Sequence, residues 1–210
     1  MKPQVDTSQY FNASYDTKER FITYWHQINA AILLKPRKML EIGIGNGLVS
    51  KYLKERGIKV TTLDIDERLN PDVAGSVLQA PFHDGSFDVV TCYEVLEHLP
   101  YDEFAIAIKE ISRVAQKYVI LSLPDVTTVY RFNIELPRVK PIKKLIKHPF
   151  PRPARHVFDG EHYWEIGKAG YPLTRIELDI KRTGLNIKKT YRVFEFYYHR
   201  FFLIEKVSGN

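Results

Sequence analysis

The spacing of apolar residues near the start of the chain predicts a helix followed by a strand that ends in glycines. An apolar stripe with helical spacing begins after Lys18 and ends before Pro36. Its members are Phe21, Trp25, Ile28 and Ile32. A short apolar run, interrupted by Glu41, then occupies 39–43. The glycine-rich segment 43–47 follows, and helical spacing resumes until Gly57. This order predicts a strand, a tight turn and a second helix.

Apolar runs alternate with helical patterns through most of the remaining chain. Runs typical of buried strands occupy 60–65, 87–92, 118–123 and 198–207, and apolar and polar residues alternate over 185–193, which also predicts a strand. A helix is predicted over 104–115, and another is predicted to begin at the capping box Thr174-x-x-Glu177 and to end at Gly184. Strands that are almost continuously apolar and alternate with helices are typical of a parallel sheet covered on both faces. We therefore predict an α/β, doubly wound fold whose last two strands form an antiparallel hairpin.

The length of 210 residues predicts one domain over 1–210. Residues 1–17 lack a period and are predicted to be a loose arm, which together with the first helix forms an N-terminal region over 1–35. The segment 124–157 interrupts the alternation with six of the twelve prolines. It also holds eight lysines or arginines against two acids, so the difference of six equals the net charge of the whole chain. Within this basic insertion, a candidate lid, we predict only a short helix near 140–147.

Composition narrows the class of protein further. No apolar run approaches the roughly 18 residues that a membrane span requires. Met1 to Gln4 lead into polar sequence, which is unlike a signal peptide. The lone cysteine, Cys92, forms neither an intrachain disulfide nor a metal cluster and fits a reducing compartment. We expect a cytoplasmic protein without a bound metal.

The glycine-rich turn and the strand that follows it indicate a site for a nucleoside-containing cofactor. Glycines between a strand and a helix allow close approach of a ligand to backbone N–H groups. Asp64 follows Gly43 by 21 residues, the spacing of an acid that binds ribose hydroxyls. A dinucleotide motif G-x-G-x-x-G is incomplete, because Leu48 or Ser50 occupies its last position. Glu41, just before the turn, suits an ammonium group better than a pyrophosphate, but these residues alone leave a nicotinamide cofactor open.

Three segments form ordered motifs: Glu41 to Gly47, Ala80 to Val90 and Tyr93 to Leu99. They resemble the motifs of S-adenosylmethionine-dependent methyltransferases of the ubiquinone/menaquinone-biosynthesis type, the type 11 family, and the resemblance covers about 38–99. It implies a class I methyltransferase with a Rossmann-like, seven-stranded sheet and S-adenosyl-L-methionine as the cofactor.

The resemblance also assigns residues to parts of the cofactor. The methionine end is expected on Glu41 and on the glycines Gly43, Gly45 and Gly47. Asp64 is expected to bind the ribose, with Ile65 beside the adenine. Ser76 stands where the family commonly has an acid, so adenine contacts are expected from Ser76, Val77 and Leu78. Cys92 and Tyr93 are expected near the sulfonium.

The acceptor side of the site is less constrained by the sequence. Methyl transfer is an in-line displacement that depends mainly on alignment, so a protein base is not obligatory. His98 and His162 are candidate catalytic residues if the acceptor is a hydroxyl. The stretch His162-Tyr163-Trp164 is expected to form a wall of the acceptor pocket or to anchor the insertion to the sheet. Glu94 and His98 have i, i+4 spacing, which would allow a divalent metal on a helix, although we expect none.

The basic insertion indicates the chemistry of a partner. Its cations would attract an anionic acceptor such as a phosphorylated sugar or a lipid-linked glycan, or a membrane surface in peripheral contact with 138–155. A nucleic acid is disfavoured because the patch is short and has few aromatics for stacking. We expect O- or N-methylation of a small-molecule, lipid-linked or sugar-linked acceptor. The alternatives are a nicotinamide-dependent oxidoreductase and a cofactor-binding module without activity.

Overall fold

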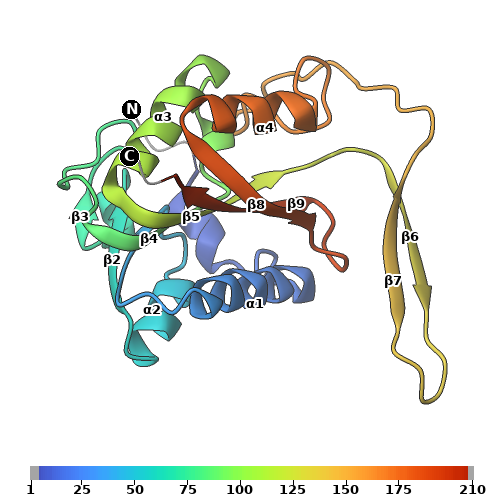
Figure 1. Ribbon diagram of the computed structural model, residues 1–210, viewed down its shortest axis with the longest axis horizontal. Helices are drawn as coiled ribbons and strands as arrows, with labels where there is room; N and C mark the ends of the chain where they lie inside the picture. Colours follow the sequence, from blue (N-terminus) through green and yellow to red (C-terminus); the bar gives the residue numbers. More distant parts are fainter. Residues whose placement is uncertain (1–4, 208–210) are drawn as a thin grey trace.

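A seven-stranded sheet forms the centre of the structure, a computed structural model that describes residues 5–207 (Figure 1). The strand order is β3-β2-β1-β4-β5-β9-β8, and only β9 pairs antiparallel with both of its neighbours. The strands are β1 (Lys38–Ile42), β2 (Lys59–Asp64), β3 (Val73–Ala74), β4 (Phe87–Tyr93), β5 (Ala115–Pro124), β8 (Leu185–Arg192) and β9 (His199–Lys206). The predicted α/β fold and its terminal hairpin are confirmed. The two-residue strand β3 was not predicted.

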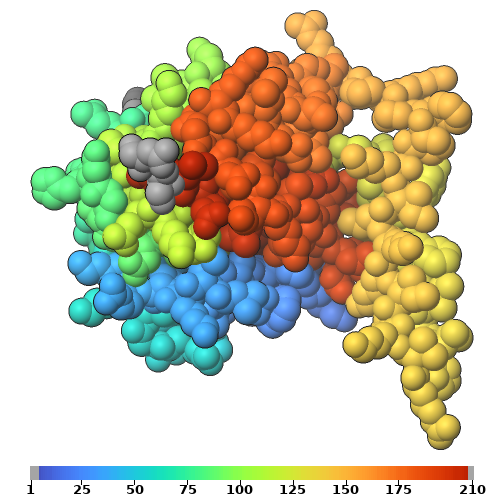
Figure 2. All heavy atoms as spheres, viewed as in Figure 1, coloured from blue at the N-terminus to red at the C-terminus, as the bar shows by residue number. Residues whose placement is uncertain are grey.

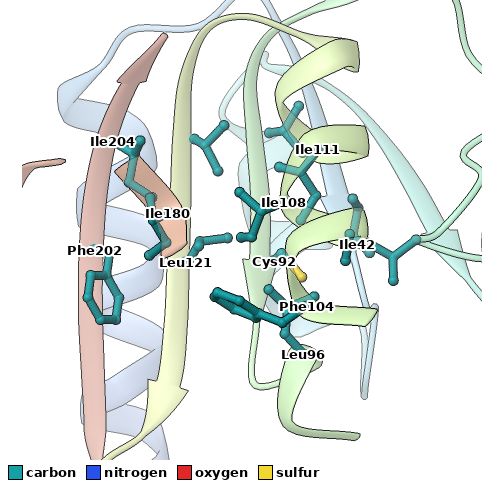
Figure 3. Packing of buried hydrophobic residues seen from close by; sticks show 14 of the residues in the cluster. Ile42, Cys92, Leu96, Phe104, Ile108, Ile111, Leu121, Ile180, Phe202 and Ile204 are labelled. Atoms are coloured by element: carbon teal, nitrogen blue, oxygen red, sulfur yellow. The ribbon is translucent and has the colours of Figure 1, made fainter. Parts of the chain in front are cut away.

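Helices cover both faces of this sheet (Figure 1). One face carries α1 (Lys18–Leu33) and α2 (Leu48–Glu55), and the other carries α3 (Tyr101–Val114) and α4 (Leu173–Arg182). Side chains alternate along each strand, so Met39 packs in the core under α1 and α2 whereas Leu40 packs under α3 and α4. Figure 3 shows the second core, in which Phe104 and Ile108 of α3 meet Leu121 of β5. Packed apolar side chains thus cover both faces of the sheet.

The first helix buries a different face from the one that its apolar stripe predicts. Thr23, Tyr24, Gln27 and Ala31 are buried. Ile28 and Ile32 are half-buried against the core, but Phe21 and Trp25 are 49% and 59% exposed. Two of the four stripe positions are therefore wrong. The helix turns Tyr24 and Gln27 inward, and both line the pocket described below.

The capping box predicted for α4 is also wrong. The helix begins after Pro172, and no side chain caps its N-terminus. Proline is tolerated at the start of a helix because the backbone N–H that it lacks would have no intrahelical acceptor there, and its φ angle is close to that of a helix. The predicted end of α4 before Gly184 is confirmed.

The basic insertion contains a β-hairpin where the sequence predicts a short helix. Strand β6 (Val129–Ile134) pairs antiparallel with β7 (Ile142–Lys147). The hairpin projects from the body beyond β8 and β9 (Figures 1 and 2). Arg200 Nε lies 2.6 Å from the buried Asp125 Oδ2 at its base, and Lys143 Nζ lies 2.9 Å from Glu195 Oε1 along its length. The helix prediction for 140–147 fails because pairing with β6 satisfies backbone groups that local spacing does not reveal.

None of the helices within residues 5–207 combines the length and the apolar character needed to cross a membrane.

Candidate functional site

A pocket opens where β1, β2 and β4 end, at the carboxyl edge of the parallel strands. This edge is where ligands bind in open α/β sheets. The pocket is partly open to solvent. Its lining includes these residues that the sequence predicts for the site: Glu41, Gly43, Gly45, Asp64, Ile65, Ser76, Val77, Tyr93 and His98. Gly47, Leu78, Cys92 and His162 are not among the lining residues.

The glycine turn and Asp64 are joined directly. Ile44 N donates to Asp64 Oδ2 at 2.8 Å, and Asp66 N donates to Oδ1 at 2.9 Å. Each carboxylate oxygen keeps a second lone pair for a ligand hydroxyl. Burial raises the pKa of Asp64, although the N–H groups of Asp66 and Ile44 oppose the shift. The site therefore holds a partly desolvated carboxylate in place before any ligand arrives.

Gly43 and Gly47 have conformations that favour glycine. Gly43 has φ +81°, and a Cβ there would lie 2.3 Å from Val95 Cγ2. Gly47 has φ +73° and is the N-cap residue of α2, so it shapes the turn without lining the pocket. The turn keeps this form because neither position accepts a side chain without strain.

Glu41 lies at the bottom of the pocket with 2% of its surface exposed. Its Oε2 has no hydrogen-bond partner among the described residues. Burial raises the pKa of Glu41 to about 8, although Ser50 opposes the shift. A buried carboxylate without a partner is costly, and a ligand cation would offset that cost.

The expected adenine contacts lie on the loop after β3. Ser76 and Val77 line the pocket together with Gly75. Ser76 Oγ accepts a hydrogen bond from Leu78 N at 3.2 Å, which occupies part of the capacity of this hydroxyl. The side chain of Leu78 packs against the core instead of the pocket.

The N-terminal arm covers the pocket, which the sequence did not indicate. The described part of the arm contains a 3-10 helix, η1 (Thr7–Phe11), and the pocket lining includes Tyr10, Tyr15 and Arg20. Tyr10 packs against Gly45, and Tyr15 meets Tyr10 edge to face at 5.5 Å between ring centroids. The prediction of a loose arm is wrong for these residues, and residues 1–4 lie outside the described part. The two tyrosines of the arm were the available signal.

The side chains of Cys92, Tyr163 and Trp164 do not line the pocket. The Cys92 side chain belongs to the core beneath α3 (Figure 3), and burial raises the pKa of its thiol. Trp164 is fully buried and donates from Nε1 to Leu99 O at 3.1 Å, so it anchors its segment to the body. Tyr163 packs against Phe158 at the surface.

A group of acids and histidines gathers beside the pocket, where β4 ends. His98, in the short helix η3 (Leu96–His98), lines the pocket, and its ring lies 5.0 Å from that of His162. Burial lowers the pKa of His98 to about 4, so its imidazole is neutral at pH 7. Burial raises the pKa of Glu94 to about 7. Burial lowers the pKa of His162, but the nearby carboxylate of Glu165 raises it, and the net shift is upward.

The fold and the site resemble those of class I S-adenosylmethionine-dependent methyltransferases. The central strand order, the glycine turn after β1 and the acid after β2 all lie in the arrangement typical of that class. Residues 40–123 match the family model described as a methyltransferase domain. Residues 4–74 also match the model of the tellurite resistance protein TehB.

Curated relatives with similar sequences are ubiquinone biosynthesis O-methyltransferases. The protein from Azoarcus sp. (strain BH72) is 32% identical over 33% of this chain and 36% of its own length. The protein from Pseudomonas aeruginosa (strain LESB58) is 38% identical over 32% of this chain and 35% of its own. The chain thus spans about a third of the length of these relatives.

Solved methyltransferases share the fold at low sequence identity. The 1,6-didemethyltoxoflavin-N1-methyltransferase of Burkholderia thailandensis, bound to S-adenosylhomocysteine, has a TM-score of 0.64 at 15% identity. The alignment covers 96% of this chain and 85% of that chain. A S-adenosylmethionine-dependent methyltransferase from Clostridium acetobutylicum ATCC 824 has a TM-score of 0.64 at 12% identity and covers 97% and 100%. The likeness to these structures concerns the fold.

Proposed function

We propose that this chain transfers a methyl group from S-adenosylmethionine to a small-molecule or lipid-linked acceptor. The observation that carries the proposal is the meeting of the glycine turn, Asp64 and Glu41 in one pocket at the carboxyl edge of the sheet. A nicotinamide cofactor is not favoured, because Glu41 lies where a pyrophosphate would need a positive or neutral surface. The motif match over 40–123 supports the same choice.

The residues present fit the cofactor part by part. Glu41, with its unpartnered oxygen, would accept hydrogen bonds from the ammonium group of the methionine end. Asp64 would bind the ribose hydroxyls with its remaining lone pairs, and Ile65, Ser76 and Val77 would line the adenine. Bound S-adenosylmethionine would supply a methyl group activated by positive sulfur. The chain would then have to hold an acceptor in line with that methyl and exclude water.

We propose a hydroxyl oxygen as the methylated atom. The relatives named O-methyltransferases support this choice over nitrogen. His98 reaches the pocket as a neutral imidazole, next to where an acceptor would lie. The tyrosines of the arm, Tyr10 and Tyr15, would close the opposite side of the pocket.

The test is binding followed by turnover. Calorimetry should show that S-adenosylhomocysteine binds the chain with one site, and NADH fluorescence should not change on mixing. Labelled S-adenosylmethionine incubated with fractionated lysate should then transfer label to an extractable small molecule or lipid. Absence of S-adenosylhomocysteine binding would contradict the proposal. Binding without transfer to any fraction would favour the inactive cofactor-binding module.

The assignment of Glu41 predicts a ligand-dependent effect of Glu41→Gln. The variant should bind S-adenosylhomocysteine at least about tenfold more weakly, because a charge-assisted hydrogen bond contributes roughly 1.5–3 kcal/mol. Affinity for methylthioadenosine, which lacks the amino-acid end, should stay the same. Calorimetry with both ligands makes this comparison within one protein.

Stability is the control for this variant. Because the pKa of Glu41 is raised in the folded state, the protein loses stability as the pH rises from the usual range of a glutamate towards about 8. Glu41→Gln should remove this pH dependence and should not lower the melting temperature at pH 7. An equal loss of affinity for both ligands would contradict the role given to Glu41.

We also infer that the β6–β7 hairpin contacts a membrane surface. In the register of the pair, Tyr130, Phe132, Ile134, Ile142, Lys144 and Ile146 share one face. Its five apolar members are 38–55% exposed. The other face includes Arg131 and Lys143, which bond to Glu195 of the body. An exposed apolar face in a strongly basic segment fits an anionic lipid surface, whereas two copies of this segment would repel each other.

Loss of the apolar face should weaken binding to vesicles. Phe132→Ser/Ile146→Ser should reduce cosedimentation with phosphatidylglycerol vesicles at least about tenfold, since burial of each such side chain contributes roughly 1.5–3 kcal/mol. Leu178→Ser, at an exposed leucine on α4, is the matched control and should bind like the wild type. Wild-type binding should also weaken in high salt and on phosphatidylcholine vesicles. Equal binding to both lipids would contradict an electrostatic contribution.

A further inference from the structure

A second cavity borders the cofactor pocket. Its lining comes from the stretch 9–20, which includes the arm and the first turn of α1, and from Phe196 in the turn between β8 and β9. We call this cavity the arm groove. Tyr15 and Arg20 line both the arm groove and the cofactor pocket, so these two side chains form the boundary between them. The parts of the cofactor assigned above leave the arm groove unused.

The lining of the arm groove combines neutral polar side chains with two aromatic rings. The polar groups are the amides and hydroxyls of Gln9, Asn12, Ser14 and Thr17. The rings belong to Tyr15 and Phe196, both half-buried. Amides and hydroxyls both donate and accept hydrogen bonds, so this lining suits a ligand that does the same.

The charges on the lining oppose each other. Its charged members are Glu19 and Arg20, one acid and one base, which are neighbours in the chain. An anionic ligand would meet the carboxylate of Glu19, and a cationic ligand would meet the guanidinium of Arg20. The arm groove therefore favours an uncharged ligand.

Contacts within the stretch 9–20 hold the arm groove in shape before a ligand binds. Asn12 Oδ1 accepts a hydrogen bond from Ser14 N at 3.0 Å, which fixes the Asn12 amide and leaves its Nδ2 hydrogens for a ligand. The guanidinium carbon of Arg20 lies 4.0 Å from the centroid of the Tyr15 ring. A largely preformed cavity with a few fixed polar groups is typical of a small-molecule site.

We propose that the arm groove binds an uncharged pyranose ring that belongs to the methyl acceptor. The hydroxyls of a sugar ring donate and accept hydrogen bonds, as do the amides and hydroxyls of the lining. The C–H groups on the faces of the ring pack against aromatic side chains, here Tyr15 and Phe196. A flat apolar ring would leave the polar lining without partners, which costs affinity.

The position of the arm groove suits a sugar that carries a lipid. The turn that contains Phe196 also contacts the β6–β7 hairpin, because Lys143 Nζ lies 2.9 Å from Glu195 Oε1 and 5.6 Å from the centroid of the Phe194 ring. The arm groove thus adjoins the cofactor pocket on one side and, on the other, the turn that contacts the hairpin.

The role of the arm groove in methyl transfer rests on the function proposed above. A pyranose in the groove would direct one hydroxyl past Tyr15 towards the methyl group. The hydroxyl oxygen would form a bond to the methyl carbon as the carbon–sulfur bond breaks, and the hydroxyl proton would pass to water.

Sugar binding by the untagged full chain tests the site without any methyl transfer. Saturation-transfer NMR should detect binding of at least one of the methyl glycosides of glucose, galactose, mannose and rhamnose. Gln9→Ala and Asn12→Ala should each weaken that binding roughly three- to tenfold, as expected for a lost hydrogen bond. Gln116→Ala and Asn186→Ala, at exposed amides elsewhere, are the matched controls and should bind like the wild type.

A further variant tests the aromatic contact. Phe196→Leu keeps an apolar side chain but removes the flat ring, and it should weaken sugar binding roughly threefold or more. Gln9, Asn12 and Phe196 do not line the cofactor pocket, so S-adenosylhomocysteine calorimetry should give the wild-type affinity in all three variants. The same measurement reports whether they fold.

Three outcomes would overturn the site. They are no binding of any of the four glycosides, equal binding of the open-chain polyol sorbitol, and glycoside affinities in Gln9→Ala and Asn12→Ala that match those of their controls. Binding of inorganic phosphate in place of the glycosides would show an anion site and would also contradict the proposal. Sugar binding without S-adenosylhomocysteine binding in the wild type would leave the site in place and contradict the proposed function.

Discussion

Asp64→Ala is expected to lower the affinity for S-adenosylhomocysteine at least about 100-fold. Two hydrogen bonds from ribose hydroxyls to a carboxylate contribute roughly 1.5–3 kcal/mol each. The variant also removes the acceptor for Ile44 N, which loosens the glycine turn that faces the same ligand. Isothermal titration calorimetry measures the change directly.

Two further variants separate ligand contacts from damage to the fold. Asp64→Asn keeps the shape and one acceptor oxygen and should lose roughly 10-fold in affinity. Because burial raises the pKa of Asp64, the ionised carboxylate costs stability above its unfolded-state pKa, so Asp64→Asn should not lower the melting temperature much at pH 7. Asp72→Asn, at an acid that pairs with Lys54 near the sheet edge, is the matched control. Affinity of Asp64→Ala within threefold of the wild type would remove the central assignment.

Gly43→Ala is expected to destabilise the protein by about 2–5 kcal/mol and to abolish measurable cofactor binding. A left-handed backbone costs a residue with a Cβ roughly 1–2 kcal/mol, and overpacking typically costs about 1–3 kcal/mol. Both costs apply because Gly43 has φ +81° and its added Cβ would meet Val95 Cγ2 at 2.3 Å. Urea unfolding gives the free energy, and calorimetry gives the affinity.

Comparison with Gly85 separates the two causes. Gly85 also has a positive φ, +61°, but a Cβ there has open space, so Gly85→Ala should show only the backbone cost. Val95→Ala in the Gly43→Ala background should restore part of the stability, because it removes the clash and leaves the strain. Additive destabilisation in that double-mutant cycle would show that the contact with Val95 is not the cause.

Several features could be predicted from the sequence because they are local. Strand, glycine turn and helix lie within 39–57, and Asp64 follows at a spacing set by one strand–helix–strand unit. The same local patterns predicted the core strands and the terminal hairpin. Errors arose where the outcome depended on pairing between segments and not on the pattern within one segment. The hairpin at 129–147 is one example, since β6 supplies the pairing that β7 needs.

Residues far apart in the chain account for most of what the sequence missed at the site. Tyr10 covers Gly45, and His162 meets His98 from 64 positions further along the chain. The prediction for Cys92 failed for a different reason. Cys92 lies at the end of β4, as predicted, but the pleat of the strand directs its side chain into the core beneath α3. Position along a strand therefore did not predict which face a side chain occupies at the pocket.

The order of short-range patterns was enough to establish the α/β sheet, the turn that faces the cofactor pocket and the acid beside it, because neighbouring residues set those features. The packing of distant segments decided that a tyrosine arm closes the pocket, that a basic hairpin leaves the body, and that two histidines and a buried glutamate meet. Such contacts form only when the whole chain has folded, and a linear pattern does not encode them.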